Sequence, residues 1–122
     1  EDKNKVIDGL KGLVRLLESN CHDVYCPVLD KKTRGLSKVD SIRNAFSKLD
    51  STEAILGWVK SSDKSEGMLL ETGYAKGKGK RFILLVQRDA DTILRGLADE
   101  IIEYDTESEL NYKLGQFFQG EI

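Results

Sequence analysis

One carboxylate, Glu71, lies in a predicted helix among small residues that leave it open to approach. At helical spacing four positions, i, i+4, i+7 and i+8, share one face: Gly67, Glu71, Tyr74 and Ala75. Because glycine has no side chain, Gly67 leaves room for a bound molecule to reach Glu71 one turn further along. A carboxylate placed in this way can act as a nucleophile. This helix face is therefore the first candidate site.

The start of the same helix offers a second kind of chemistry. Ser65 is a favourable N-cap residue, and it comes directly before the helical pattern. A phosphate bound there would meet unpaired backbone N–H groups, a hydroxyl and the positive end of the helix dipole. Taken alone, Ser65 fits an N-cap better than a phosphate ligand, and it can be both.

The elements that must hold these residues alternate between helices and strands. Apolar residues at helical spacing indicate amphipathic helices, and uninterrupted apolar runs indicate buried strands. Gly77 and Gly79 follow the helix that carries Glu71 and are expected to end it. The expected helices cover 3–19, 40–49, 65–76 and 106–118, with a helix or turn at 91–97, and the expected strands cover 22–29, 54–59, 82–86 and 100–104.

This alternation predicts a parallel sheet with helices on both faces, in a single domain over residues 1–122. We expect a flavodoxin-like, three-layer α/β sandwich. That fold has its first strand at the centre of the sheet, whereas this chain begins with a helical pattern. Because a sheet without its central strand would expose two edges, we expect residues ahead of Glu1 to supply it.

Composition excludes several classes of function. Of the 122 residues, 39% are hydrophobic and 33% charged, and the net charge of -2 argues against a nucleic acid polymer as partner. No apolar run approaches the roughly 20 residues of a membrane span, and the start does not resemble a signal peptide. Cys21 and Cys26 would point to opposite faces of a strand, and His22 is the sole histidine. We expect free thiols, no metal and a cytoplasmic protein.

Residues 52–80 resemble the nucleoside 2-deoxyribosyltransferase superfamily. Its members have a buried strand, then a helix with the pattern G-x-x-x-E-x-G-x-A and a glycine–lysine turn, which here read Thr52 to Val59, Gly67 to Ala75 and Gly77 to Lys80. The chain is most similar to the branch that cleaves nucleoside 5'-monophosphates, the 2'-deoxynucleoside 5'-phosphate N-hydrolases and cytidine monophosphate hydrolases. That branch has a serine six residues before the glutamate, where the transferases have an aspartate, and this chain has Ser65.

The resemblance implies that Glu71 attacks the anomeric carbon of a nucleoside 5'-monophosphate, forming a glycosyl intermediate that water then releases. Ser65 would bind the 5'-phosphate, about 1.5 turns from Glu71, and Gly67 would let the sugar pass. Trp58 either stacks on the base or packs in the core, and Asn44 is a further candidate for substrate binding. No cofactor is implied, and relatives are homodimers or larger, with a neighbouring chain completing each site.

Two departures from the family pattern leave alternatives open. Glu53 stands where relatives have an aspartate, and Ala45 stands where many have the acid that assists departure of the base. The alternatives are a deoxyribosyl transfer between bases and a nucleotide-sensing module without turnover. A structural domain similar to a response-regulator receiver is weaker, because no phosphoacceptor aspartate follows Val59 or Val86 at the required place.

Overall fold

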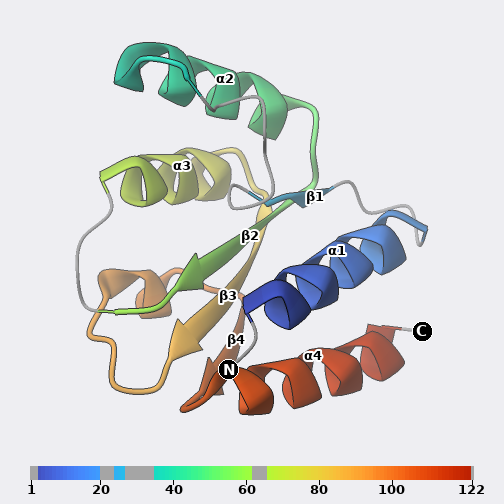
Figure 1. Ribbon diagram of the computed structural model, residues 1–122. Coiled ribbons are helices and arrows are strands. Elements are labelled where there is room, and N and C mark those ends of the chain that lie inside the picture. Colours follow the sequence, from blue (N-terminus) through green and yellow to red (C-terminus); the bar gives the residue numbers. More distant parts are fainter. Residues whose placement is uncertain (1–2, 20–23, 27–34, 62–65, 122) are drawn as a thin grey trace.

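The computed structural model of the chain describes residues 3–19, 24–26, 35–61 and 66–121 (Figure 1). Its elements follow the expected alternation of helices and strands. The helices are α1 (Lys3–Ser19), α2 (Lys38–Asp50), α3 (Glu66–Gly77) and α4 (Glu107–Glu121), with the short 3₁₀ helix η3 (Ile93–Gly96), and the strands are β1 (Val24–Tyr25), β2 (Ala54–Val59), β3 (Arg81–Gln87) and β4 (Glu100–Tyr104).

The four strands form one parallel sheet in sequential order, β1-β2-β3-β4. The β2–β3 pair is the longest, running in register from Ala54↔Arg81 to Val59↔Val86. Strand β1 lies at one edge of this sheet. It pairs with β2 over two residues, beginning at Val24↔Ala54. The further strand that we expected at the centre of the sheet would come from residues ahead of Glu1. In the described sheet β1 pairs with the first two of the six residues of β2, so the rest of this edge of β2 has no pairing with β1.

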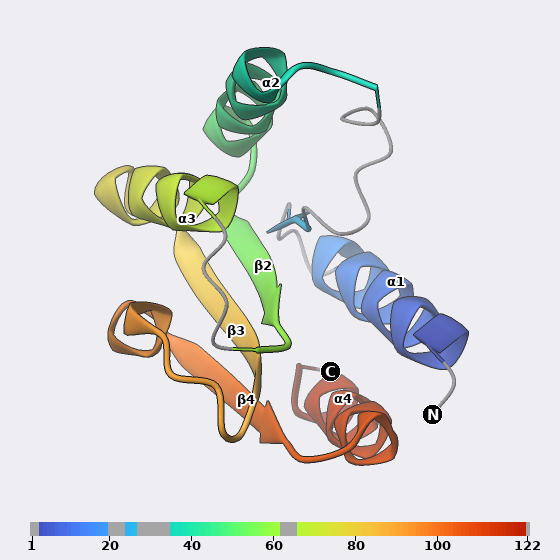
Figure 2. The same cartoon turned by 60° about the vertical axis from the view of Figure 1, so that its left-hand side comes forward.

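The helices cover both faces of the sheet (Figure 2). Helices α2 and α3, with η3, lie on one face, and α1 and α4 lie on the other. Along β2, Leu56 and Trp58 pack towards α1 and α4, whereas Ile55 packs towards α2 and α3. Both faces of the central strands are therefore buried, which explains their uninterrupted apolar sequences. This arrangement confirms the flavodoxin-like, three-layer α/β class.

Most elements differ from their expected bounds by one to three residues, as α4 does by ending at Glu121 rather than at residue 118. Helix α2 begins at Lys38 rather than at residue 40, because the Ser37 hydroxyl caps it by accepting the Asp40 backbone N–H at 3.1 Å. Strand β1 is described at Val24–Tyr25, inside the expected 22–29, and Cys26, next to it, is buried; residues 22–23 and 27–29 lie outside the described residues. Cys21 and His22 lie outside the described residues.

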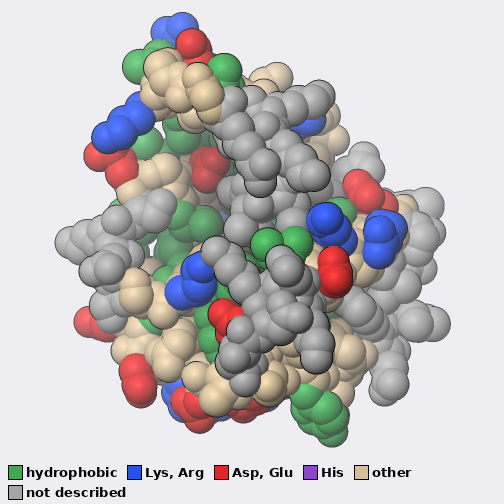
Figure 3. Space-filling view, in the orientation of Figure 1, with side chains coloured by type: hydrophobic (Ala, Val, Ile, Leu, Met, Phe, Trp, Pro, Cys, Tyr) green, Lys and Arg blue, Asp and Glu red, His purple; other side chains and the backbone are tan. Residues whose placement is uncertain are grey.

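The surface mixes charges of both signs. On the face shown in Figure 3, basic and acidic side chains are interspersed over the helices. No helix in the described parts of the chain is long and apolar enough to cross a membrane.

Candidate functional site

Helix α3 lies close against the sheet because β2 has a glycine beneath it. A Cβ atom built on Gly57 would be 3.1 Å from Cε1 of Phe82 and 3.2 Å from the Met68 sulfur. These are close contacts for a Cβ atom, so Gly57 permits the approach of α3 to β2. Gly57 thus allows the first turn of α3, which carries Met68, to lie close to the sheet.

Glu71 lies on a flank of α3, neither in the core nor fully exposed. Thr72 and Ala75 are fully buried against the sheet, and the Thr72 hydroxyl donates to the Met68 carbonyl oxygen at 2.7 Å. Glu71 is half-buried beside this face. One turn earlier, Gly67 is also half-buried, and a Cβ atom placed there would meet no atom within 4 Å. A Cβ atom at Gly67 would therefore meet open space among the described residues.

An aromatic contact joins α3 to α2. The Tyr74 ring stacks on Phe46 with centroids 4.1 Å apart and planes 9° from parallel. The Tyr74 hydroxyl donates to Asp50, and this hydrogen bond is the main reason that the pKa of Tyr74 is raised. Asn44 is half-buried on α2, two residues before Phe46. This contact fixes the helix that carries Asn44 against the helix that carries Glu71.

Trp58 is on the other face of the sheet from Glu71. Its side chain lies in the core under α1 and α4, with 8% of the residue exposed. The indole N–H donates to the Tyr104 hydroxyl oxygen at 2.8 Å, and the Lys60 ammonium lies 4.7 Å from the ring centroid. The structure favours the core role of Trp58. Stacking on a base would require Lys60 to leave the ring, and this role stays a prediction.

The predicted phosphate ligand Ser65 lies outside the described residues, so its relation to Glu71 also stays a prediction. Residues 3–19, 24–26, 35–61 and 66–121 contain no metal-binding cluster, that is, no group of three or more histidine, cysteine, aspartate or glutamate side chains that could hold an ion. The described part of the predicted site therefore consists of Glu71 and Gly67 on α3, with Asn44 on the adjacent α2.

The sequence analysis missed a charged network where β3 and β4 end. Arg88, after β3, forms ion pairs with Asp105 and Glu109. Glu109 accepts the Asp105 backbone N–H at 2.6 Å, and this bond, with Arg88 and Lys113, lowers its pKa to about 2. In return the Thr106 hydroxyl accepts the Glu109 N–H at 3.1 Å. The T-x-x-E spacing of a capping box could have identified this network.

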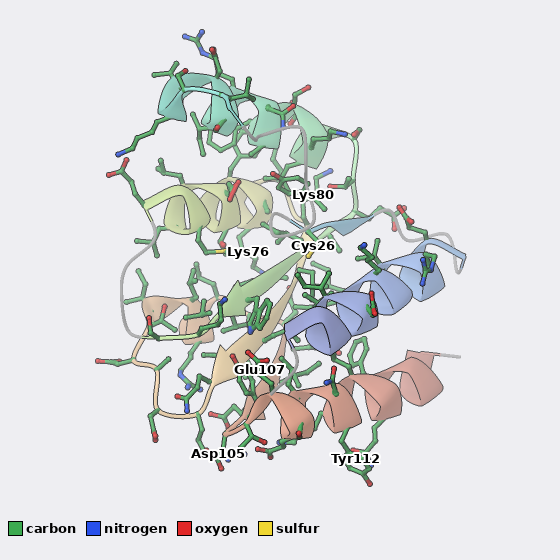
Figure 4. The ribbon with its side chains drawn as sticks, viewed as in Figure 1. Cys26, Lys76, Lys80, Asp105, Glu107 and Tyr112 are labelled. Atoms are coloured by element: carbon green, nitrogen blue, oxygen red, sulfur yellow. The ribbon has the colours of Figure 1, made fainter. Side chains whose placement is uncertain are left out.

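A second missed residue is Glu107, in the first turn of α4. Figure 4 shows Glu107 on the inner side of this helix, whereas Tyr112 on the same helix points outward. The Oε2 atom of Glu107 is buried and has no hydrogen-bond partner among the described residues. A buried carboxylate oxygen without a donor costs about 1–3 kcal/mol or more. No feature of the sequence marks this residue.

Comparison with solved structures finds a likeness to the CMP N-glycosidase BcmB of Clostridium botulinum, with a TM-score of 0.63 and 21% sequence identity. The alignment covers 94% of this chain and 93% of that chain. At this identity the likeness shows a shared fold, in agreement with the fold that the sequence resemblance implied. No protein-family model and no curated protein matches the chain.

Proposed function

We propose that this chain hydrolyses the N-glycosidic bond of a nucleoside 5'-monophosphate. The observation that carries the proposal is Glu71, half-buried on α3 with open space at Gly67 one turn earlier. The fold shared with a CMP N-glycosidase supports it. Together they favour a carboxylate nucleophile that a sugar can reach, and no cofactor is part of the proposal.

The reaction proceeds in two steps at one carbon atom. A Glu71 oxygen attacks the anomeric carbon, the C–N bond breaks, and the base leaves with the bonding electron pair and takes up a proton. Water then attacks the same carbon, which restores the carboxylate and releases (deoxy)ribose 5-phosphate. Ser65 and the backbone N–H groups at the start of α3 are proposed to hold the 5'-phosphate.

The first test is product analysis with a panel of nucleoside 5'-monophosphates. Glu71→Gln should lower kcat/KM on the order of 10³-fold or more, because the amide is a poor nucleophile. Glu66→Gln is the matched control, since Glu66 is exposed in the first turn of the same helix. Unfolding midpoints establish that both variants fold. Normal turnover by the Glu71 variant would refute the mechanism.

A glycine pair tests the route to the carboxylate. A Cβ atom would meet nothing within 4 Å at either Gly67 or Gly73, so alanine at either site should leave the fold intact. Gly67→Ala should nevertheless lower kcat/KM about 100-fold, because the new methyl group displaces the sugar from Glu71. Gly73→Ala should leave kcat/KM unchanged. Equal activity of the two variants would contradict the proposed approach past Gly67.

Two alternatives are separated by the same substrates. For a deoxyribosyltransferase, bases would exchange on unphosphorylated nucleosides, and Ser65→Ala would have no effect. For the proposed hydrolase, Ser65→Ala weakens phosphorylated substrates far more than bare nucleosides. A nucleotide-sensing module would show saturable binding without products. This alternative has specific support, since Ala45 is fully buried where many relatives have an acid.

We also propose that the active form is a homodimer or larger. This rests on the sequence resemblance, in which a neighbouring chain completes each site. Light scattering at several concentrations would measure the oligomeric state, and mixing Glu71→Gln with wild-type chains would show whether sites are shared. A fully active monomer would contradict this part of the proposal.

A further inference from the structure

Helix α3, which carries Glu71, is held against the sheet by few large side chains. Its fully buried residues are Thr72 and Ala75, and both are small. Three of its twelve residues are glycines, which are poor helix formers. A Cβ atom on any of these glycines would meet no atom within 4 Å, so the glycine positions add little packing. The direction in which Glu71 points therefore depends on contacts made by the other side chains of α3.

Tyr74 makes contacts that join α3 to its neighbour α2. The two helices lie side by side on one face of the sheet (Figure 2). The Tyr74 ring stacks on Phe46, with centroids 4.1 Å apart, and the Tyr74 hydroxyl donates to Asp50. Because Phe46 and Asp50 are four residues apart on α2, one side chain engages a full turn of that helix. Just beyond α3, the Lys78 ammonium lies 5.4 Å from the centroid of the Tyr74 ring. Tyr74 is thus held by three partners.

Glu71 lies on the same flank of α3 as Tyr74. The two residues are three positions apart, so they are neighbours along one side of the helix. A side-chain tip lies about 5–6 Å from the axis of an α-helix, and a rotation of about 10° around that axis moves the tip by about 1 Å. A misplacement of about 1 Å can slow a reaction about 100-fold. A contact that fixes the rotation of α3 therefore bears directly on a reaction at Glu71.

We propose that Tyr74 is a positioning residue for Glu71. Its contacts with Phe46 and Asp50 set the rotation of α3 around its axis, and so the direction in which the Glu71 carboxylate points. The inference rests on the proposed function, in which Glu71 is the nucleophile. Tyr74 itself does not touch the reacting atoms, so its replacement should change the rate of the reaction rather than the binding of substrate.

The opposite flank of α3 provides a matched control. Lys76 donates to both carboxylate oxygens of Asp99, at 3.0 Å each, which joins α3 to the residue before β4. Lys76 is five positions after Glu71, about 140° around the helix. Its side chain is 30% exposed, and a solvent-screened ion pair constrains rotation less than stacked rings do. Lys76→Met should therefore leave kcat unchanged, although it also removes a contact of α3.

Kinetics with a nucleoside 5'-monophosphate give the first test. Tyr74→Leu and Phe46→Leu should each lower kcat about 10- to 100-fold and leave KM within about twofold, because the carboxylate is displaced while the phosphate site is kept. Tyr74→Phe keeps the stacked rings and should lose less than about threefold in kcat. The double variant Tyr74→Leu/Phe46→Leu should lose no more than either single variant, since both remove the same contact. Unfolding midpoints establish that each variant is folded in the assay.

Crystal structures of the wild type, Tyr74→Leu and Lys76→Met give a second test, which needs no turnover. After superposition on β2 and β3, the Glu71 carboxylate should move by about 1 Å in Tyr74→Leu and stay in place in Lys76→Met. If the wild type forms no product, the proposed function fails, and this displacement still decides whether Tyr74 positions Glu71.

Three results would overturn the inference. The first is a wild-type kcat in Tyr74→Leu, and the second is a raised KM in place of a lowered kcat. The third is a Glu71 carboxylate that stays in place when Tyr74 is replaced.

Discussion

Replacing Gly57 with alanine should destabilise the protein, although alanine is intrinsically the better residue for a strand. The new Cβ atom would lie 3.1 Å from Cε1 of Phe82 and 3.2 Å from the sulfur of Met68. Carbon atoms prefer separations of about 3.5–4.0 Å, so the neighbours must move by several tenths of an ångström. The flexible Met68 can move, but Phe82 is fully buried in β3.

The magnitude follows from two opposing effects. Overpacking a filled interior costs about 1–3 kcal/mol. Replacing glycine with alanine also lowers the conformational entropy of the unfolded chain, which stabilises the folded state by about 0.5–1 kcal/mol. From the middle of each range, the net loss in the free energy of unfolding for Gly57→Ala is about 1 kcal/mol. For a chain of this length we expect a fall of about 2–8 °C in the midpoint.

Urea unfolding followed by Trp58 fluorescence measures this loss. Gly73→Ala is the matched control, because Gly73 lies in α3 and a Cβ atom there meets nothing within 4 Å. This control should gain about 0.5–1 kcal/mol, since alanine is the better helix residue. The two alanine variants should thus shift in opposite directions. A Gly57 variant as stable as the wild type would refute the reasoning that α3 rests on a glycine.

Two further predictions concern the ends of β3 and β4. The pKa of Glu109 is lowered from 4.5 to about 2 by the Asp105 backbone N–H and Arg88, so its stabilising effect is present above pH 4.5 and lost as the pH falls towards 2. Glu109→Gln should flatten the decline of the urea midpoint over this interval, and an unchanged slope would contradict the assignment. Arg95 donates to three backbone carbonyl groups within residues 87–90. Arg95→Lys should lose about 1–2 kcal/mol in urea unfolding, because lysine cannot reproduce the planar set of donors.

The sequence predicted the central sheet well because its signals are local. Uninterrupted apolar runs identified β2 and β3, which have both faces buried. The pairing of β1 with β2 was not predictable, because strand order depends on contacts between distant segments. The start of α2 was also missed, since Ser37 lies in a stretch rich in charges that obscured the cap.

For the candidate site, the sequence specified the spacing along α3 but not the surroundings of each side chain. Gly67 and Glu71 occupy one region of the helix because helical geometry fixes their separation. Trp58 could not be assigned to a face, since β2 is apolar throughout and has no polar alternation. The burial of the Glu107 Oε2 atom arises only when α4 is folded against the rest of the chain. The roles of Glu71, Ser65 and Asn44, and the single-domain assignment, stay predictions.

Helices α1 and α4 pack closely against each other. Gly9 in α1 lies so close to Leu114 in α4 that an added Cβ atom would be 3.2 Å from its Cδ1 atom. Strand β1, by contrast, joins the sheet through two residue pairs. Loss of α4 should therefore release the α1–β1 segment as well, so that opposite ends of the chain open as one cooperative unit. Backbone amides in the two helices should then exchange with deuterium at similar rates, although nearly the whole sequence separates them.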